Sequence, residues 1–236
     1  MPTAMILAAG RGERMRPLSD ATPKPLLPVG GVPLIVRQIR SLAAAGITEV
    51  VINAAHLAER LVAVLGDGRA LDVAIRWSRE AEPLEAAGGI ATALPLLPDG
   101  PVLVVSGDLW TAFDYAALLP RARAMGDDPR EARAHLVMVP NPPFHPRGDF
   151  VLREGAPGRV ATGGGPTRTY GNIGLFDTAL FRELPRGTRL KLLPLLLDWI
   201  GQGLVTGEPY DGPWENVGTP DDLARVDALL AQERKA

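Results

Sequence analysis

Apolar residues in the first half of the chain follow two alternating patterns. Continuous apolar runs are typical of buried parallel strands, and they lie at residues 3–10, 49–56, 72–80 and 100–110. Apolar residues at helical spacing predict helices at residues 33–46, 57–68 and 86–97. Strands that alternate with helices indicate an α/β fold, with a doubly wound, mostly parallel sheet covered by helices on both faces.

The rhythm changes after about Leu119. The later pattern predicts strands at 132–141 and 169–177, a hairpin of 148–154 with 158–163, and helices at 191–203 and 219–236. We expect a single domain of residues 1–236. Its first half, residues 1–120, would bind one ligand, and residues 121–236 would complete the pocket.

Composition narrows the function classes. The chain has 236 residues, 46% of them hydrophobic, which is enough for a sizeable core. A net charge of −2 argues against a general nucleic-acid or anionic-membrane binder, and the absence of cysteine excludes disulfides and thiolate metal sites. The sequence contains no signal peptide pattern and no membrane-spanning run. We therefore expect a cytoplasmic protein without nucleic-acid or membrane partners, either a monomer or a small homo-oligomer.

The first strand runs into a glycine-rich, cationic loop, LAAGRGERMRPLSDATPKPLL, at residues 7–27. Ligands of doubly wound sheets bind at the carboxyl ends of strands, where this loop begins. Its glycines allow backbone N–H groups to approach an anion, and its basic side chains suit phosphate oxygens: Gly10, Gly12, Arg11, Arg14, Arg16 and Lys24. Only three of the 25 basic residues are lysine, so Lys24 stands out. The alternative is a mobile surface loop with solvated arginines.

Two common phosphate-binding motifs do not fit this loop. The dinucleotide fingerprint needs a third glycine three residues after Gly12, where Met15 stands. A P-loop needs four residues between its glycines, followed by lysine and serine or threonine, and this pattern is missing.

The stretch LAAGRGERMRPLSDATPKPLLPVGG resembles the signature of the sugar-1-phosphate nucleotidylyltransferases, roughly L-A-G-G-x-G-T-R-L-x-P-L-T-x-x-x-P-K-P. The resemblance continues to WENVGTP at residues 214–220. Within the family, the sequence looks most like a branch of short bacterial proteins. It implies a Rossmann-like nucleotidyltransferase fold and nucleotidyl transfer from a nucleoside triphosphate to a sugar 1-phosphate, with release of pyrophosphate. The branch implies UTP and N-acetylmuramate α-1-phosphate as substrates. Guanylyl transfer to mannose or heptose 1-phosphate and cytidylyl transfer stay as alternatives.

The resemblance also assigns the nucleotide site. In this family the loop after the first strand holds the triphosphate, which here means Ala8, Ala9, Gly10, Arg11 and Gly12. Lys24 matches the lysine of P-K-P, and we expect Lys24 and Arg16 to offset phosphate charge during catalysis. The segment PLEAAGGI at 83–90 resembles the family segment beside the nucleobase and adds Glu85 and Gly88. From the residues alone, the alternative is a helix start packed on the sheet.

A magnesium site is expected at Asp108, which follows the most hydrophobic strand in VSGDLW. A carboxylate there suits either Mg²⁺ or a helix cap, and the resemblance favours the metal. Ser106, in the same segment, is assigned to the nucleotide. The position that usually holds the second metal aspartate is Asn216, which offers a carbonyl oxygen but no charge. This departure keeps open a nucleotide-sugar sensor that binds without turnover.

Two later segments resemble the sugar side of the family site. NPPFHPRGDF at 141–150 and TYGNIGLF at 169–176 assign sugar-phosphate binding to Asn141, Asp149, Gly171 and Asn172. The second rare lysine, Lys191, is expected near the sugar phosphate. His145 fits a solvated loop histidine better than a general base.

Overall fold

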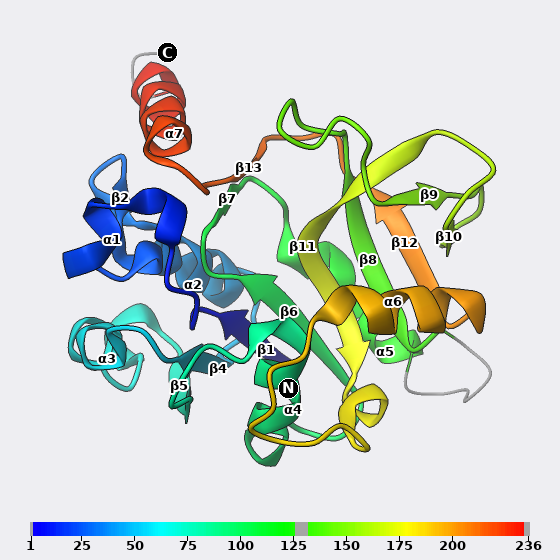
Figure 1. The fold of residues 1–236 in the computed structure, drawn as a ribbon, viewed down its shortest axis with the longest axis horizontal. Helices are drawn as coiled ribbons and strands as arrows, with labels where there is room; N and C mark the ends of the chain where they lie inside the picture. Colours follow the sequence, from blue (N-terminus) through cyan, green and yellow to red (C-terminus); the bar gives the residue numbers. More distant parts are fainter. Residues whose placement is uncertain (1, 126–131, 234–236) are drawn as a thin grey trace.

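The computed structural model describes residues 2–125 and 132–233, and its centre is a nine-stranded sheet (Figure 1). Across the sheet the order is β5 (Ala74–Arg79), β4 (Glu49–Ala54), β1 (Thr3–Leu7), β6 (Pro101–Ser106), β11 (Thr167–Asp177), β8 (Ala134–Val139), β12 (Val205–Pro209), β10 (Gly158–Ala161) and β9 (Phe150–Leu152). Pairing directions reverse only at β11 and β10, so seven of these nine strands run the same way. The mostly parallel sheet expected from the sequence is confirmed.

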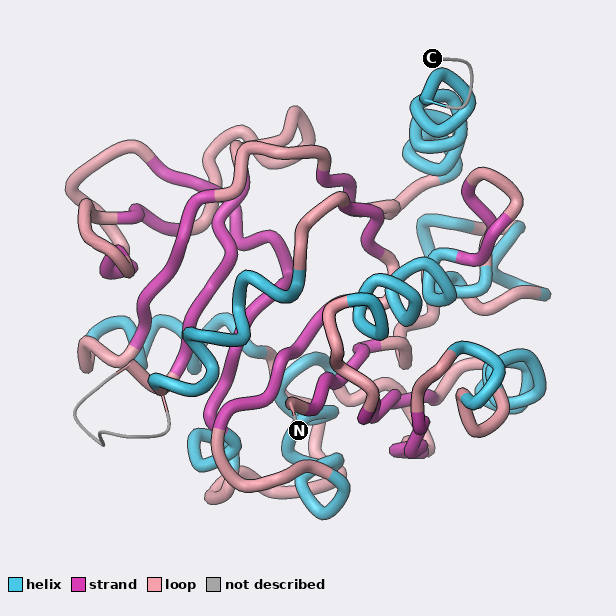
Figure 2. The backbone as a smooth tube through the Cα atoms, turned by 180° about the vertical axis from the view of Figure 1, so that it is seen from behind, coloured by secondary structure: helices cyan, strands magenta, loops and turns pink. Residues whose placement is uncertain are grey.

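Helices cover both faces of this sheet. Figure 1 shows α4 (Glu85–Ala93) and α6 (Leu192–Gly201) over one face, and Figure 2 shows α2 (Leu34–Ala44) and α5 (Leu119–Ala124) over the other. The helix α3 (Ala58–Leu65) packs into the same apolar cluster as α2. Strand β1 contributes side chains to the apolar clusters on both faces of the sheet, because successive side chains of a strand point to opposite faces. Met5 therefore joins the cluster with α4 and α6, whereas Ala4 and Ile6 join the other.

The C-terminal helix α7 (Pro220–Glu233) packs beside the N-terminal loop rather than on the main sheet (Figure 1). Its Val226 joins an apolar cluster with Met15 and Val29, and Asp227 accepts a hydrogen bond from the Gly30 N–H. Four short strands and one short helix complete this region: β2 (Pro28–Val29), β3 (Val32–Pro33), β7 (Leu109–Thr111), β13 (Trp214–Asn216) and α1 (Leu18–Ala21). None of the described helices has the length and apolar character needed to cross a membrane.

The sequence predicts most of these elements, with two instructive differences. The strand predicted at 100–110 is two strands, β6 and β7, because the chain turns at Gly107 and Asp108. Strand β12 was not expected, since Gly207 and Pro209 have low β propensity, yet it pairs with both β8 and β10. The hairpin of 148–154 with 158–163 is confirmed as β9 and β10. The final residues of the predicted terminal helix, 234–236, lie outside the described part.

A buried polar network fixes the chain where β1 ends. Asn53, at the end of β4, accepts a hydrogen bond from the Ala8 N–H at 2.7 Å and donates one to Glu80 Oε1 at 2.7 Å. The second oxygen of Glu80 accepts from the Leu84 N–H at 3.1 Å. Burial raises the pKa of the Glu80 carboxyl above its ordinary value. The network therefore joins the loop after β1 to the segment that precedes α4.

We predict that Asn53→Asp makes stability depend steeply on pH. The new carboxylate would still accept from Ala8 N–H but would face Glu80, so at pH 8 we expect a loss of about 2–4 kcal/mol in the free energy of unfolding. Near pH 5 the pair can share a proton and recover most of that loss. The sign follows because the folded pKa of the pair lies above its unfolded value, so stability falls as pH rises.

Urea unfolding at both pH values measures this effect. Asn53→Ala is the control, since it removes both hydrogen bonds without adding a charge. Because Glu80 then loses a donor, this variant should lose only moderately more stability at pH 8 than at pH 5. If the loss for Asn53→Asp depends on pH no more steeply than that for Asn53→Ala, the proposed contact between the two carboxyl groups is wrong.

Candidate functional site

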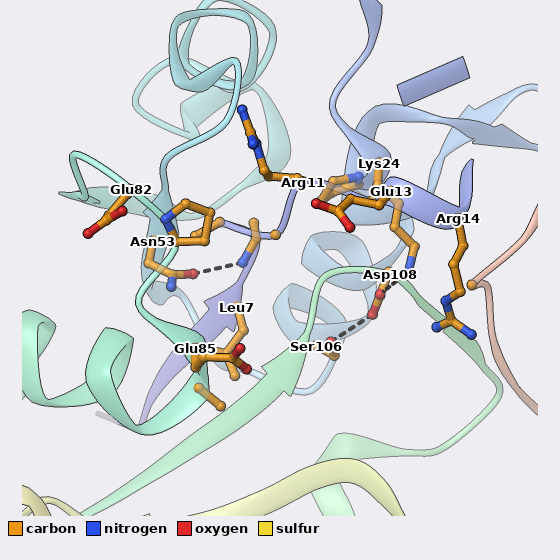
Figure 3. A pocket seen from close by; sticks show the side chains of 18 of the residues that line it. Leu7, Arg11, Glu13, Arg14, Lys24, Asn53, Glu82, Glu85, Ser106 and Asp108 are labelled. Atoms are coloured by element: carbon orange, nitrogen blue, oxygen red, sulfur yellow. Dashed lines mark hydrogen bonds and ion pairs between the residues drawn. The ribbon is translucent and has the colours of Figure 1, made fainter. Parts of the chain in front are cut away.

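A cavity of about 800 Å³ opens at the carboxyl ends of β1, β4 and β6, where Leu7, Asn53 and Ser106 line it (Figure 3). Its volume lies in the range of cavities that hold small molecules and cofactors, about 300–1,000 Å³. It brings together nine residues that the sequence assigns to the nucleotide, to catalysis or to the metal: Ala8, Ala9, Gly10, Arg11, Gly12, Lys24, Glu85, Ser106 and Asp108. We call this space the first cavity.

Gly12 allows the loop to fold tightly beside Lys24. Its φ angle is +63°, and an added Cβ would lie 3.1 Å from the Lys24 Cβ. Its carbonyl accepts hydrogen bonds from the Ser19 hydroxyl at 2.7 Å and from the Met15 N–H at 2.9 Å. A side chain at this position would be strained in the left-handed region and would crowd the lysine. The glycine is therefore required by the loop conformation.

Asp108 is held by two neighbours at the edge of the first cavity. Lys24 Nζ forms an ion pair with Asp108 Oδ2, and the Ser106 hydroxyl donates to Oδ1 at 2.7 Å (Figure 3). The side chains of Lys24 and Asp108 are only 12% and 22% exposed. Weak screening at such sites makes the pair stronger than a surface ion pair. Both carboxylate oxygens thus have partners within the protein.

The arginines of the loop separate into two groups. Arg11 and Arg14 line the first cavity, and neither forms an ion pair with another residue in the described ranges. Arg16 does not line it: its side chain is 64% exposed and pairs with Asp20 at 3.0 Å. The structure therefore does not bring Arg16 to the site where catalysis was expected. Arg14 occupies that region instead, with its guanidinium 3.0 Å from the position of an added Cβ on Gly218.

Glu85 begins α4 on the opposite side of the first cavity from Lys24 (Figure 3). It has a φ of +62°, which is unusual for a residue with a side chain, and its carboxylate pairs with Arg189 at 2.9 Å. Gly88 is outside the cavity. Its N–H donates to the Leu190 carbonyl, and an added Cβ would lie 2.2 Å from the Thr188 carbonyl oxygen. Gly88 thus serves close packing of α4 rather than presenting an N–H to a ligand.

A second cavity of about 330 Å³ adjoins the first, and Ala86 lines both. Asp149, Asn172 and Asn216 line this second cavity, as does His145. His145 Nε2 lies 2.9 Å from Asp149 Oδ1, and Asp149 Oδ2 accepts from the Tyr170 N–H at 2.8 Å. These two contacts fix the orientation of the Asp149 carboxylate.

Asn172 reaches the second cavity because β11 is irregular there. Its φ is +54°, and the register between β11 and β8 shifts between Tyr170 and Gly174. A bulge of this kind redirects a side chain away from the regular alternation of the strand. Asn172 and Glu85 are thus two residues in the left-handed region that each line a cavity.

Three residues expected at the sugar side do not line either cavity. The side chain of Asn141 forms hydrogen bonds with Thr167 and Thr169, at 3.0–3.2 Å. Gly171 is buried, and its carbonyl accepts from the Trp214 indole N–H at 2.9 Å. Lys191 is exposed at the residue before α6. The first two support neighbouring residues of the second cavity instead of facing it.

The pairing of β7 with β13 joins the turn that holds Asp108 to Asn216, although the two residues line different cavities. Asn216 of β13 is opposite Leu109 of β7, and the Val217 N–H donates to the Asp108 carbonyl at 3.0 Å. Within residues 2–125 and 132–233, no three His, Cys, Asp or Glu side chains come together as a metal site. The available donors, one carboxylate and one amide oxygen, fit Mg²⁺ that is shared with ligand phosphates. They do not form a complete cage for an ion.

The sequence interpretation missed several lining residues. Arg14 could have been found, because the only arginine in the family signature falls on it, whereas Arg16 falls on a variable position. Asn53, Glu82 and Arg189 carry no comparable signal, since they reach the first cavity from separate parts of the chain. The same holds for the aromatic and apolar walls of the second cavity, which are Phe144, Phe150, Tyr170, Leu192, Leu193, Leu196 and Trp214.

Comparison with known proteins places the chain in a family. Residues 3–143 match the nucleotidyl transferase family. The chain is 46% identical to an N-acetylmuramate alpha-1-phosphate uridylyltransferase of Neisseria meningitidis, over 96% of this chain and 97% of the relative. It is 30% identical to a mannose-1-phosphate guanylyltransferase of Mycobacterium tuberculosis, over 97% of this chain and 64% of that protein.

The fold agrees with this assignment. A crystal structure from Bacillus anthracis, described as a glucose-1-phosphate thymidylyltransferase, superposes with a TM-score of 0.80 at 21% identity, over 97% of this chain and 95% of that chain. Such low identity supports the fold alone. Together with the sequence matches, the arrangement of a loop-lined cavity at the strand ends leads to one conclusion: the chain belongs to the nucleotidyl transferase family and is a nucleotidyltransferase.

Proposed function

We propose that this protein transfers a uridylyl group from UTP to N-acetylmuramate α-1-phosphate and releases pyrophosphate, as a cytoplasmic step in the recycling of cell-wall sugars. The observation that carries the proposal is the meeting of two cavities at Ala86, one large and lined by the cationic loop, the other small. A nucleoside triphosphate would occupy the first, and a sugar the second. The 46% identical uridylyltransferase supports the choice of substrates.

The reaction requires no nucleophilic side chain. An oxygen of the sugar 1-phosphate attacks the α-phosphorus of the triphosphate, the new P–O bond forms, and the bond to the β-phosphate oxygen breaks in line. Pyrophosphate leaves with the electron pair. The protein must therefore align two anions and offset their charge, which is the usual basis of catalysis in phosphoryl transfer.

We assign charge neutralisation to Arg11, Arg14 and Lys24. The two arginines have no ion-pair partner among the described residues, so their guanidinium groups are available to non-bridging oxygens. Lys24 would exchange Asp108 for a phosphate oxygen. Backbone N–H groups of the loop from Gly10 to Gly12 add donors without added charge. When it is bound with the triphosphate, Mg²⁺ would supply further charge neutralisation, and Asp108, with Asn216 nearby, would hold it.

The second cavity would hold the acceptor. Asp149, oriented by His145 and the Tyr170 N–H, can accept hydrogen bonds from sugar hydroxyls, and Asn172 can both donate and accept. On the nucleotide side, Glu82 and Glu85 can accept from the N–H groups of a base. Uracil and guanine both carry such groups, so the carboxylates do not distinguish them. Guanylyl transfer to mannose 1-phosphate is therefore the second candidate, favoured by the 30% identical relative.

Substrate use tests the proposal directly. Pyrophosphate release would be measured with UTP, GTP, CTP and dTTP, each against N-acetylmuramate, N-acetylglucosamine, mannose and heptose 1-phosphates. We expect kcat/KM to be highest for UTP with N-acetylmuramate 1-phosphate. A preference for GTP with mannose or heptose 1-phosphate would support the second candidate, and binding of nucleotide or sugar phosphate without pyrophosphate release would indicate a sensor.

We predict that Arg14→Ala and Arg16→Ala differ sharply. Arg14 faces the first cavity, and the loss of one charged contact in a phosphoryl-transfer site should lower kcat/KM by about a hundredfold. Arg16 forms a surface pair with Asp20, which is worth little, so its variant should stay within about twofold of the parent. Steady-state kinetics of the two purified variants decides this. Equal losses in both would return Arg16 to the mechanism.

Lys24→Met should change metal binding and turnover in opposite directions. Without Lys24, Asp108 loses a positive neighbour, and the nucleotide-free protein should bind Mn²⁺, a spectroscopic substitute for Mg²⁺, about tenfold more tightly. The same variant should lose about a hundredfold in kcat, because the lysine no longer contacts phosphate.

Electron paramagnetic resonance of free Mn²⁺ measures the first effect, and pyrophosphate release the second. Lys24→Arg keeps the charge and should not tighten Mn²⁺ binding. If Lys24→Met also leaves Mn²⁺ affinity unchanged, the lysine does not compete with the metal for Asp108.

A further inference from the structure

Two large apolar side chains are exposed to water at the mouth of the second cavity. Phe144, in the loop after β8, is 53% exposed, and Leu193 of α6 is 51% exposed. Single exposed apolar residues are common on protein surfaces. These two differ from the others because they come from separate elements and line the same small cavity. A ligand in this cavity would cover them.

The interior of the second cavity already provides what a sugar ring needs. Asp149, Thr169 and Asn172 offer hydrogen-bonding groups for hydroxyls, and Tyr170 and Trp214 add aromatic surface for the apolar face of a ring. Its volume of about 330 Å³ is near the lower limit for ligand cavities, which suits one monosaccharide. Phe144 and Leu193 are therefore available to contact something that projects from the ring.

The charges around the second cavity restrict what that projecting group can be. Among the described residues that line it there is no lysine or arginine, and its one histidine contacts Asp149. An anionic group buried there would have no cation and would lose its hydration, which is costly. Any carboxylate on the acceptor must therefore stay in solvent at the mouth, with the carbon atoms that attach it lying between the two apolar side chains.

We infer that Phe144 and Leu193 determine acceptor specificity by binding the lactyl ether of a muramate-type sugar phosphate. The inference rests on the proposed function and adds the residues that select its acceptor. The methyl and methine groups of the lactyl substituent contact Phe144 and Leu193, and its carboxylate remains hydrated. A hexosamine phosphate that lacks this substituent makes the interior contacts and leaves both side chains exposed to water.

The test compares two acceptors that differ only in the lactyl group: N-acetylmuramate 1-phosphate and N-acetylglucosamine 1-phosphate, each with saturating UTP. The variants are Phe144→Ala and Leu193→Ala. The matched control is Leu197→Ala, since Leu197 lies one turn further along α6, is 44% exposed and does not line the cavity. Because all three side chains are on the surface, the variants should fold, and thermal unfolding checks this.

We expect each of Phe144→Ala and Leu193→Ala to lower kcat/KM for the muramate about tenfold, mainly through KM, and to leave the glucosamine acceptor within twofold. Leu197→Ala should change neither value. Equal losses with both acceptors, or no loss with either, would overturn the inference. The proposed function would still hold in that case, provided that the parent protein transfers the uridylyl group to the muramate. If the parent protein transfers to neither acceptor, the proposed function fails as well.

Discussion

The ion pair between Lys24 and Asp108 connects the two parts of the chain on which the first cavity depends. Lys24 belongs to the cationic loop, and Asp108 follows the central strand β6. With the Ser106 hydroxyl on its other oxygen, the carboxylate has a defined orientation before any ligand arrives. The Val217 N–H, directly after β13, donates a hydrogen bond to the Asp108 carbonyl, which extends this connection to β13. The loop, the strand end and the later segment with Asn216 are therefore positioned together.

Patterns among neighbouring residues predict the strands and turns that depend on local interactions. Apolar runs became β1, β4 and β6, because strands buried on both faces need them, and the glycines of the loop predicted a close backbone approach. Arrangements that depend on contacts between distant segments were harder to predict from the sequence. The pairing of β11 between β6 and β8, and the hydrogen bond from the Gly88 N–H to the Leu190 carbonyl, depend on neighbours that are far away in the sequence. A helix start that faces a ligand and one that faces protein have the same sequence pattern.

The site residues show the same division. That Lys24 and Asp108 line one cavity could be expected, because Lys24 lies in the P-K-P motif of the loop after β1 and Asp108 follows β6 directly. The difference between Arg14 and Arg16 depends on the turn of the 3-10 helix Glu13–Met15, which directs one guanidinium toward Gly218 and leaves the other beside Asp20. Asn141 lines neither cavity, and its side chain hydrogen bonds with Thr167 and Thr169 instead. Proximity in sequence to a ligand-binding residue does not determine which side chain reaches the ligand.

The packing of α7 has a consequence for synthesis on the ribosome. Asp227 of α7 bonds Gly30, 197 positions earlier, and Gly218 borders the first cavity beside Arg14. The loop to which we assign triphosphate binding thus leaves the exit tunnel well before the groups that complete its surroundings. A nascent chain that has emerged only through β6 presents the cationic loop without α7 or β13 against it. The surroundings of the first cavity are consequently complete only after α7 has been synthesised and has packed beside the loop.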